Sequence, residues 1–155
     1  MTAIDQWHAY IRSNDPAALH DLLDPEVTFD SPVVHKTQHG RAITHSYLTA
    51  ATLVLGGPEF HYIGEWHSDD GAVLEFETVI DGVTVNGVDI IRLTDDGKKI
   101  AGFKVMVRPL KAVNLIHQLM AAMLARPPSD TAPDQRPPSA TSSASGVNGS
   151  SPEPG

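Results

Sequence analysis

The sequence predicts an α+β fold: a cone-shaped, curved antiparallel sheet packed against N-terminal helices and followed by a C-terminal helix. Three observations predict it. Residues 3–55 are mostly helical in pattern, residues 59–107 alternate between apolar and polar side chains, and residues 109–124 return to helical spacing. Turns rich in Asp and Gly separate the alternating segments, as in an antiparallel meander. A strongly curved sheet covered by helices on one face leaves a cavity for a small ligand.

The N-terminal part of the chain combines helical periodicity with one strand. Ile4, Trp7 and Ile11 recur at the spacing of an amphipathic helix, and Pro16 marks the start of a second helix. The strand that follows alternates apolar and polar residues but is interrupted by Pro32. The predicted elements are a helix, a second helix, a strand and a third helix, over residues 3–13, 17–23, 27–34 and 40–55.

Four strands and a final helix complete the predicted domain. Asp81-Gly82 is a strong signal for a two-residue hairpin, and residues 69–71 and 94–97 have the composition of turns. Pro109 opens the last helix. These elements are predicted over residues 59–67, 72–80, 83–93 and 100–107 for the strands and 109–124 for the helix.

The composition changes at about residue 125. The chain has 155 residues, which suits one domain with a sizeable core. Residues 126–155 hold seven of the 12 prolines and, apart from Val147, no apolar side chain larger than alanine. Such a segment buries too little surface to offset the entropy of ordering it. We therefore predict a single domain over residues 1–125 and a disordered tail rich in Pro, Ser, Ala and Thr over residues 126–155.

Charge and composition exclude several classes of protein. The chain has 11 basic and 19 acidic residues, a net charge of −8, so no nucleic-acid partner is expected. It has no cysteine, which excludes disulfides and Cys-based zinc sites. No segment approaches the roughly 20 apolar residues of a membrane helix, and the N-terminus lacks the pattern of a signal peptide. A soluble, cytoplasmic protein is the expectation.

Strand alternation assigns side chains to the two faces of the sheet. The set expected to face the cavity is Leu74, Phe76, Thr78, Phe103, Val105 and Val107. The opposite face carries Glu75 and Glu77 beside Lys104 and Arg108. That outer face is either solvated or a dimer interface, in which the charges are mixed with apolar side chains such as Met106.

Asp89 is an unusual residue for its place in the sequence. It lies in the strand-like segment NGVDIIRL and shares the inward face with Ile91 and Leu93. A carboxyl group among apolar neighbours is costly unless it is neutral or hydrogen-bonded, and burial raises its pKa. Asp89 is thus either a proton donor to a ligand or a core carboxylate held by a backbone amide, a buried hydroxyl or an indole.

His35 and Trp7 are further candidates. If the strand register continues past Pro32, His35 reaches the cavity rim, where an imidazole could act as a base. The Trp7 indole could line the pocket and donate a hydrogen bond to a buried oxygen. The histidines around residues 35–45 have no helical HExxH spacing, so no metal site is predicted. Nothing in the sequence indicates a cofactor.

The chain resembles the nuclear transport factor 2-like superfamily, in its bacterial SnoaL-like and ketosteroid-isomerase-like branch. The segments that carry the resemblance are DPAALHDLLDPEVTFDSPV, HGRAITHSYL and GVDIIRLTDDGKKIAGFKVMVRPL. The resemblance implies a homodimer. In ketosteroid isomerases an aspartate base, two tyrosines and a neutral aspartic acid form the site. The aligned positions here are, in that order, Ser31, Trp7, Leu48 and Asp89, of which only Asp89 matches.

These observations lead to two functional hypotheses, because one fold hosts many activities. The first is a cofactor-independent isomerase, cyclase or hydrolase that acts on a hydrophobic small molecule bearing a carbonyl or hydroxyl group, with Asp89 as acid and His35 as a possible base. The second is a non-catalytic ligand-binding or dimeric scaffold domain. The sequence leaves open whether the protein is an enzyme.

Overall fold

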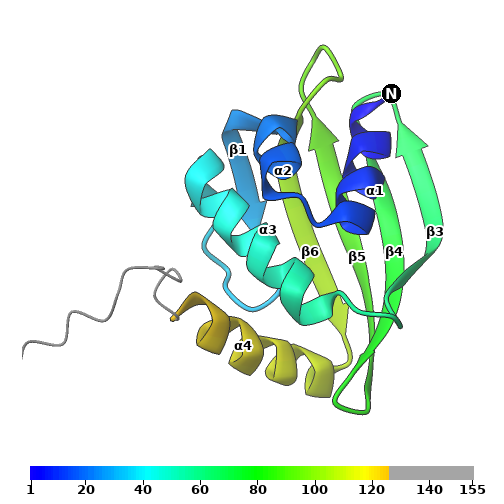
Figure 1. Cartoon of the computed structure of the whole chain (residues 1–155), viewed down its shortest axis with the longest axis vertical. Coiled ribbons are helices and arrows are strands. Elements are labelled where there is room, and N and C mark those ends of the chain that lie inside the picture. The colour runs from blue at the N-terminus through cyan, green and yellow to red at the C-terminus, as the bar shows by residue number, and fades with distance from the viewer. Residues whose placement is uncertain (126–155) are drawn as a thin grey trace, which may run out of the picture.

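The computed structural model describes residues 1–125, which form four helices and six strands (Figure 1). In chain order these are α1 (Ala3–Ser13), α2 (Pro16–Leu22), β1 (Leu23–Asp30), β2 (Gln38–His39), α3 (Arg41–Leu55), β3 (His61–Ser68), β4 (Gly71–Ile80), β5 (Val83–Leu93), β6 (Ile100–Arg108) and α4 (Leu110–Leu124). The predicted tail, residues 126–155, lies outside the described residues. No helix in residues 1–125 is both long and apolar enough to cross a membrane.

Local sequence signals set the ends of the first two helices. Thr2 and Asp5 form a reciprocal capping box at the start of α1, and Asn14 ends that helix in the left-handed conformation. Asp15 then caps α2, whose first residue is Pro16. Trp7 on α1 faces the sheet, where it packs against Phe103 of β6 and is 3% exposed.

The six strands form one sheet in the order β2-β1-β6-β5-β4-β3. The strands β3 to β6 are the predicted antiparallel meander. The sheet as a whole is mixed rather than antiparallel, because β1 pairs in parallel with β6. These two strands are neighbours in space but distant in sequence, and strand alternation does not reveal the direction of such a pairing. β1 also ends at Asp30, before Pro32, instead of extending to residue 34.

The helices cover one side of this curved sheet and enclose its concave face. In Figure 1, α1, α2 and α3 lie in front of the sheet, and α4 lies below α3 near the lower end of the sheet. The core lies between these layers and includes Leu48 from α3, Phe76 from β4, Phe103 from β6 and Ile116 from α4. The predicted cone-shaped α+β architecture with a terminal helix is confirmed.

The predicted division of strand residues between the two faces is also confirmed. Leu74 and Phe76 are fully buried, whereas Val79 is 41% and Met106 52% exposed. Asp89 lies directly opposite Leu74 on β4 and Val105 on β6, so it faces inward with them. The sheet therefore directs this carboxyl group toward the helices.

Candidate functional site

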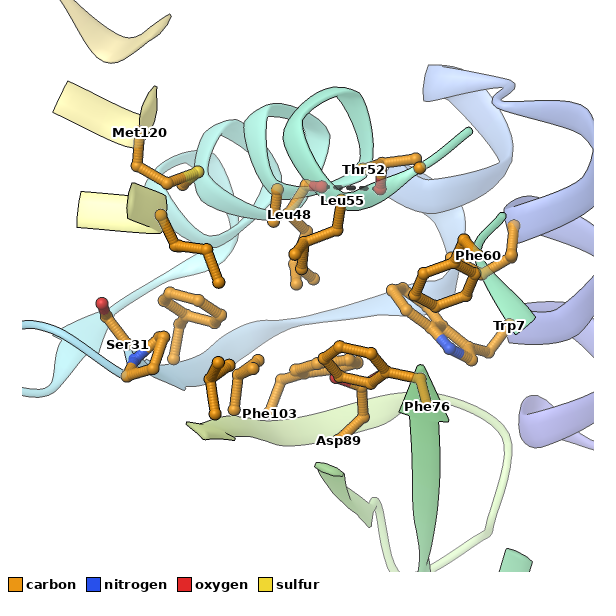
Figure 2. Close-up of a pocket in the computed structure, with 18 of the residues that line it drawn as sticks. Trp7, Ser31, Leu48, Thr52, Leu55, Phe60, Phe76, Asp89, Phe103 and Met120 are labelled. Carbon is orange, nitrogen blue, oxygen red and sulfur yellow. Dashed lines mark hydrogen bonds between the residues drawn. The ribbon is translucent and has the colours of Figure 1, made fainter. Parts of the chain in front are cut away.

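A cavity of about 380 Å³ lies between the concave face of the sheet and the helices α1, α3 and α4 (Figure 2). Its lining is mostly apolar. The aromatic residues of the lining are Trp7, Phe29, Phe60, Tyr62, Phe76 and Phe103. The aliphatic side chains that complete most of the wall are Ile11, Val33, Leu48, Leu55, Val105, Val107, Ile116 and Met120. Its volume falls in the range of small-molecule pockets.

Asp89 lies on the floor of this cavity and is tied to two other elements. The Tyr62 hydroxyl on β3 donates a hydrogen bond of 2.7 Å to Oδ2 of Asp89. The indole Nε1–H of Trp7 on α1 donates to the Tyr62 oxygen at 2.9 Å. Figure 2 shows Asp89 beside Phe76 and Phe103, across the cavity from Leu48 and Leu55 on α3.

The direction of this hydrogen-bond chain is fixed by its first member. An indole nitrogen can only donate, so the Tyr62 oxygen accepts from Trp7 and its own proton points to Asp89. Oδ2 of Asp89 is therefore an acceptor. Oδ1 has no hydrogen-bond partner among residues 1–125 and belongs to a residue of the cavity lining. Oδ1 is thus the atom that remains for a ligand, as a donor when protonated and as an acceptor when ionised.

Burial dominates the electrostatics of the site. It raises the pKa of Asp89 to about 7, although the hydrogen bond from Tyr62 stabilises the ionised form and lowers this pKa in part. Burial, followed by the nearby Asp89 carboxylate, also raises the pKa of Tyr62, which therefore stays protonated as a donor. The site holds one group that changes its charge near neutral pH.

A glycine on β5 makes room for the floor of the cavity. A Cβ at Gly87 would come within 2.4 Å of the Phe76 ring and within 2.7 Å of the carbonyl oxygen of Met106. Gly87 pairs directly with Phe76 on β4. The absence of a side chain lets the Phe76 ring lie across β5, two residues from Asp89, where it forms part of the lining.

Most of the residues predicted to form the site lie at this cavity. Trp7, Phe76, Phe103, Val105 and Val107 line it together with Asp89. Leu74 and Thr78 face inward but lie outside the lining. Leu74 is fully buried in the core, and the Thr78 hydroxyl donates to the carbonyl oxygen of Leu55 at 3.3 Å.

The structure does not place His35 at the cavity rim. This side chain is exposed and lies outside the lining, because β1 ends at Asp30 and the alternation does not continue past Pro32. Ser31 does line the cavity, and its hydroxyl oxygen accepts a bond of 3.1 Å from the Val33 N–H. The Ser31 position, where the resemblance expects an aspartate base, therefore provides a hydroxyl group only.

Tyr62 is the central residue that the sequence analysis did not single out, and it lies directly before a bulge in β3. Tyr62 pairs with Phe76 while Gly64 pairs with Glu75, so Ile63 is an extra residue. The bulge reverses the alternation, which leaves Tyr62 inside the fold and Trp66, at the same sequence parity, 59% exposed on the outer face. Gly64 was the available signal, because an isolated glycine in a strand often accompanies a bulge.

The remaining polar groups of the lining are few. Among the described residues, Asp89 is the one carboxylate of the lining and Arg12, exposed at the end of α1, is its one cationic side chain. No group of three or more His, Asp or Glu side chains within residues 1–125 is arranged to hold a metal ion. The arrangement is suited to binding an apolar molecule with one polar contact at Asp89.

Comparisons with known proteins agree with this fold. The family model of the SnoaL-like domain matches residues 4–102. A steroid Δ-isomerase from Pseudomonas aeruginosa is 32% identical, with 79% of this chain and 89% of that chain covered and a TM-score of 0.74. A protein with a cystatin-like fold from Silicibacter pomeroyi is 29% identical, with coverages of 77% and 83% and a TM-score of 0.71.

More distant structures share the fold alone. A nuclear transport factor 2-like protein from Burkholderia xenovorans is 17% identical, with 75% of this chain and 88% of that chain covered and a TM-score of 0.57. Comparison with curated proteins gives no match. On the match to most of its folded part and the similarity to the isomerase structure, the chain belongs to the SnoaL-like domain family of the nuclear transport factor 2-like superfamily.

Proposed function

We propose that the cavity binds a hydrophobic small molecule and that Asp89 donates a proton to its one polar atom, in acid–base chemistry of the isomerase or cyclase type. The observation that carries this proposal is the free Oδ1 of Asp89 on the floor of an apolar cavity. Apolar walls bind the body of the ligand, and one polar group fixes its orientation.

The chain from Trp7 through Tyr62 prepares Asp89 for this role. Both donors are buried or half-buried, and they hold the carboxyl group through Oδ2 while Oδ1 remains free. With a pKa of about 7, Asp89 is protonated in a large fraction of molecules at neutral pH. A group with that pKa both gives up a proton and regains it readily, which suits general acid catalysis.

The similarity to a steroid Δ-isomerase supports this class of chemistry but not the same division of roles. Ser31 stands where the resemblance expects the carboxylate base, and a hydroxyl group needs a partner to accept its proton. Asp89 is the one carboxylate of the lining within the described residues. We therefore propose that Asp89 alone carries the proton, with Trp7 and Tyr62 as positioning residues.

A second candidate function is a non-catalytic ligand-binding or scaffold domain that forms a homodimer through the outer sheet face. The observation that favours it is the row of exposed apolar side chains on that side of the sheet. These are Ile63, Trp66, Val79 and Met106. Homodimerisation is a proposal from the family resemblance, and it is compatible with a working cavity on the opposite face.

Binding of 2-acetylnaphthalene between pH 4 and 9 tests the first proposal. This ligand is apolar apart from a carbonyl oxygen that can only accept a hydrogen bond. The wild type is expected to bind it, with an affinity that falls as the pH rises through about 7 and Asp89 loses its proton. In Asp89→Asn this pH dependence should disappear, whereas the matched change Asp69→Asn, in an exposed turn, should leave it intact.

Two results would contradict the proposal. The first is an absence of binding to the correctly folded wild type. The second is the same pH profile in the wild type and in Asp89→Asn, since the carboxyl group would then not meet the ligand.

A further inference from the structure

The surroundings of Asp89 are rich in aromatic rings. On the sheet, Phe76 of β4 and Phe103 of β6 occupy the positions diagonal to Asp89 on its inward face. The centroid of the Trp7 ring lies 4.7 Å from that of Phe103, and the Tyr62 and Phe76 centroids are 6.5 Å apart. The hydrogen bond from Trp7 to Tyr62 joins these two ring pairs, and all four rings line the same cavity as Asp89.

The ionised form of Asp89 has stabilising donors but no counter-ion. The Tyr62 hydroxyl donates to Oδ2 and the Trp7 indole donates to the Tyr62 oxygen, an arrangement that favours the carboxylate. No Lys, Arg or His within residues 1–125 forms an ion pair with Asp89. Arg12 lines the same cavity but is exposed and forms neither a hydrogen bond nor an ion pair with the carboxyl group. A buried charge of this kind is normally paired.

The other titratable groups near the site do not provide a positive partner. On β3, Tyr62 is held neutral by its raised pKa. His8 on α1 packs edge-on against the Tyr62 ring but is paired with Glu65 on β3, which also contacts His67. Glu65 lies outside the lining and adds negative charge near Tyr62.

We propose that the natural ligand is a hydrophobic amine, whose ammonium group lies against Oδ1 of Asp89 and the surrounding aromatic rings. This inference rests on the proposed function and names its ligand class. An aliphatic amine is an ammonium ion in water near neutral pH and pairs with the Asp89 carboxylate, and an amine that enters uncharged takes the proton from Oδ1 and forms the same ion pair. Aromatic faces attract a cation, and the carboxylate supplies the opposite charge. The ammonium is thus the counter-ion that residues 1–125 do not provide.

An anionic ligand is disfavoured by the same features. It would bring a second negative charge to the ring faces and to Asp89, in a chain of net charge −8. Arg12 is the one feature of the lining that would attract it. A neutral ligand would form a hydrogen bond with protonated Asp89 but would provide no counter-ion for the ionised form.

The test uses three naphthalene ligands of similar shape that differ in charge: 1-naphthylmethylamine, 1-naphthalenemethanol and 1-naphthoic acid. Their affinities for the full-length wild type are measured by calorimetry at pH 8. We expect the ammonium ligand to bind about tenfold or more tighter than the alcohol and the naphthoate to bind weakest. In Asp89→Asn the amine should lose this advantage, while the affinity of the alcohol changes by less than about threefold.

A matched variant separates the local charge from the net charge of the protein. Glu77→Gln removes one negative charge from the outer face of the same sheet and should leave the preference for the amine unchanged. If Glu77→Gln and Asp89→Asn weaken amine binding equally, the attraction comes from the net charge and the inference is overturned. It is overturned as well if the alcohol or the naphthoate binds as tightly as the amine.

A permanently charged ligand adds a pH signature. For (1-naphthylmethyl)trimethylammonium, which does not titrate, the affinity should rise as the pH increases through about 7, because Asp89 becomes ionised. A flat profile in the wild type contradicts the ion pair.

If none of the naphthyl ligands binds, the proposed pocket fails together with the inference. If the neutral ligands bind with a contribution from Asp89 but the amine has no advantage, only the inference fails.

Discussion

Asp89 binds its proton more tightly in the folded chain than in the unfolded one. Its pKa of about 7 lies above the value near 4 of an unfolded aspartate. The folded state is therefore most stable when Asp89 is protonated, and stability is lost as the pH rises from about 4 to about 7. Above about pH 7 this loss of stability is complete and no longer changes with pH. The shift corresponds to about 4 kcal/mol, an order-of-magnitude figure.

The substitution Asp89→Asn tests whether the protonation of Asp89 changes the free energy of unfolding in this way. Because Asn does not titrate, the variant should gain stability relative to the wild type as the pH increases from about 4 to about 7. Urea unfolding at several pH values measures the difference in the free energy of unfolding. A difference that is independent of pH in this range would show that Asp89 has an ordinary pKa.

Tyr62 is predicted to control both the proton affinity of Asp89 and the packing of Trp7. In Tyr62→Phe the carboxylate loses its donor, so the pKa of Asp89 should rise above about 7. The buried Trp7 N–H also loses its acceptor, which should cost about 1–3 kcal/mol of stability. Carboxyl-carbon NMR and urea unfolding measure the two effects. An unchanged Asp89 titration would refute the hydrogen-bond chain.

At the scale of elements, β5 and β4 shape the cavity through Gly87. In Gly87→Ala the new methyl group would overlap the Phe76 ring and the Met106 carbonyl, so the ring or the strand must move. We expect a loss of about 1–3 kcal/mol in stability and weaker ligand binding. Adding Phe76→Leu should recover part of the stability, since a smaller side chain relieves one of the two contacts. A fully tolerated Gly87→Ala would contradict this account of the cavity floor.

The helices and strands also show which features of the fold the sequence predicts and which it does not. Helical periodicity and the Asp81-Gly82 hairpin predicted the helices and the meander, because these features depend on local chemistry. Alternation placed Asp89 inward for the same reason. The parallel pairing of β1 with β6 and the bulge at Ile63 depend on contacts between distant segments, which a periodic pattern does not contain. His35 was misplaced because it follows the end of β1, and Trp66, which follows the bulge, lies on the face opposite to the one that alternation gives it.

At the scale of the whole molecule, the uncovered outer face of the sheet suits association with a second copy. Met106 is 52% and Val79 41% exposed on a side that no described helix covers. We predict a homodimer of twice the 16.6 kDa chain mass in sedimentation at micromolar concentration. Met106→Glu should shift it toward monomer, and the control Leu53→Glu, on the exposed side of α3, should not. A wild-type protein that sediments as a monomer throughout would contradict the prediction.

The most direct test of the account is a carboxyl-carbon NMR titration of Asp89 with and without saturating 1-methylnaphthalene. This ligand fills an apolar cavity and offers no hydrogen bond, so it removes solvent from Oδ1. The account predicts a pKa of about 7 in the free protein and a higher pKa in the complex, because further desolvation disfavours the carboxylate. A pKa near 4, or one that saturating ligand leaves unchanged, would show that Asp89 does not face the ligand cavity.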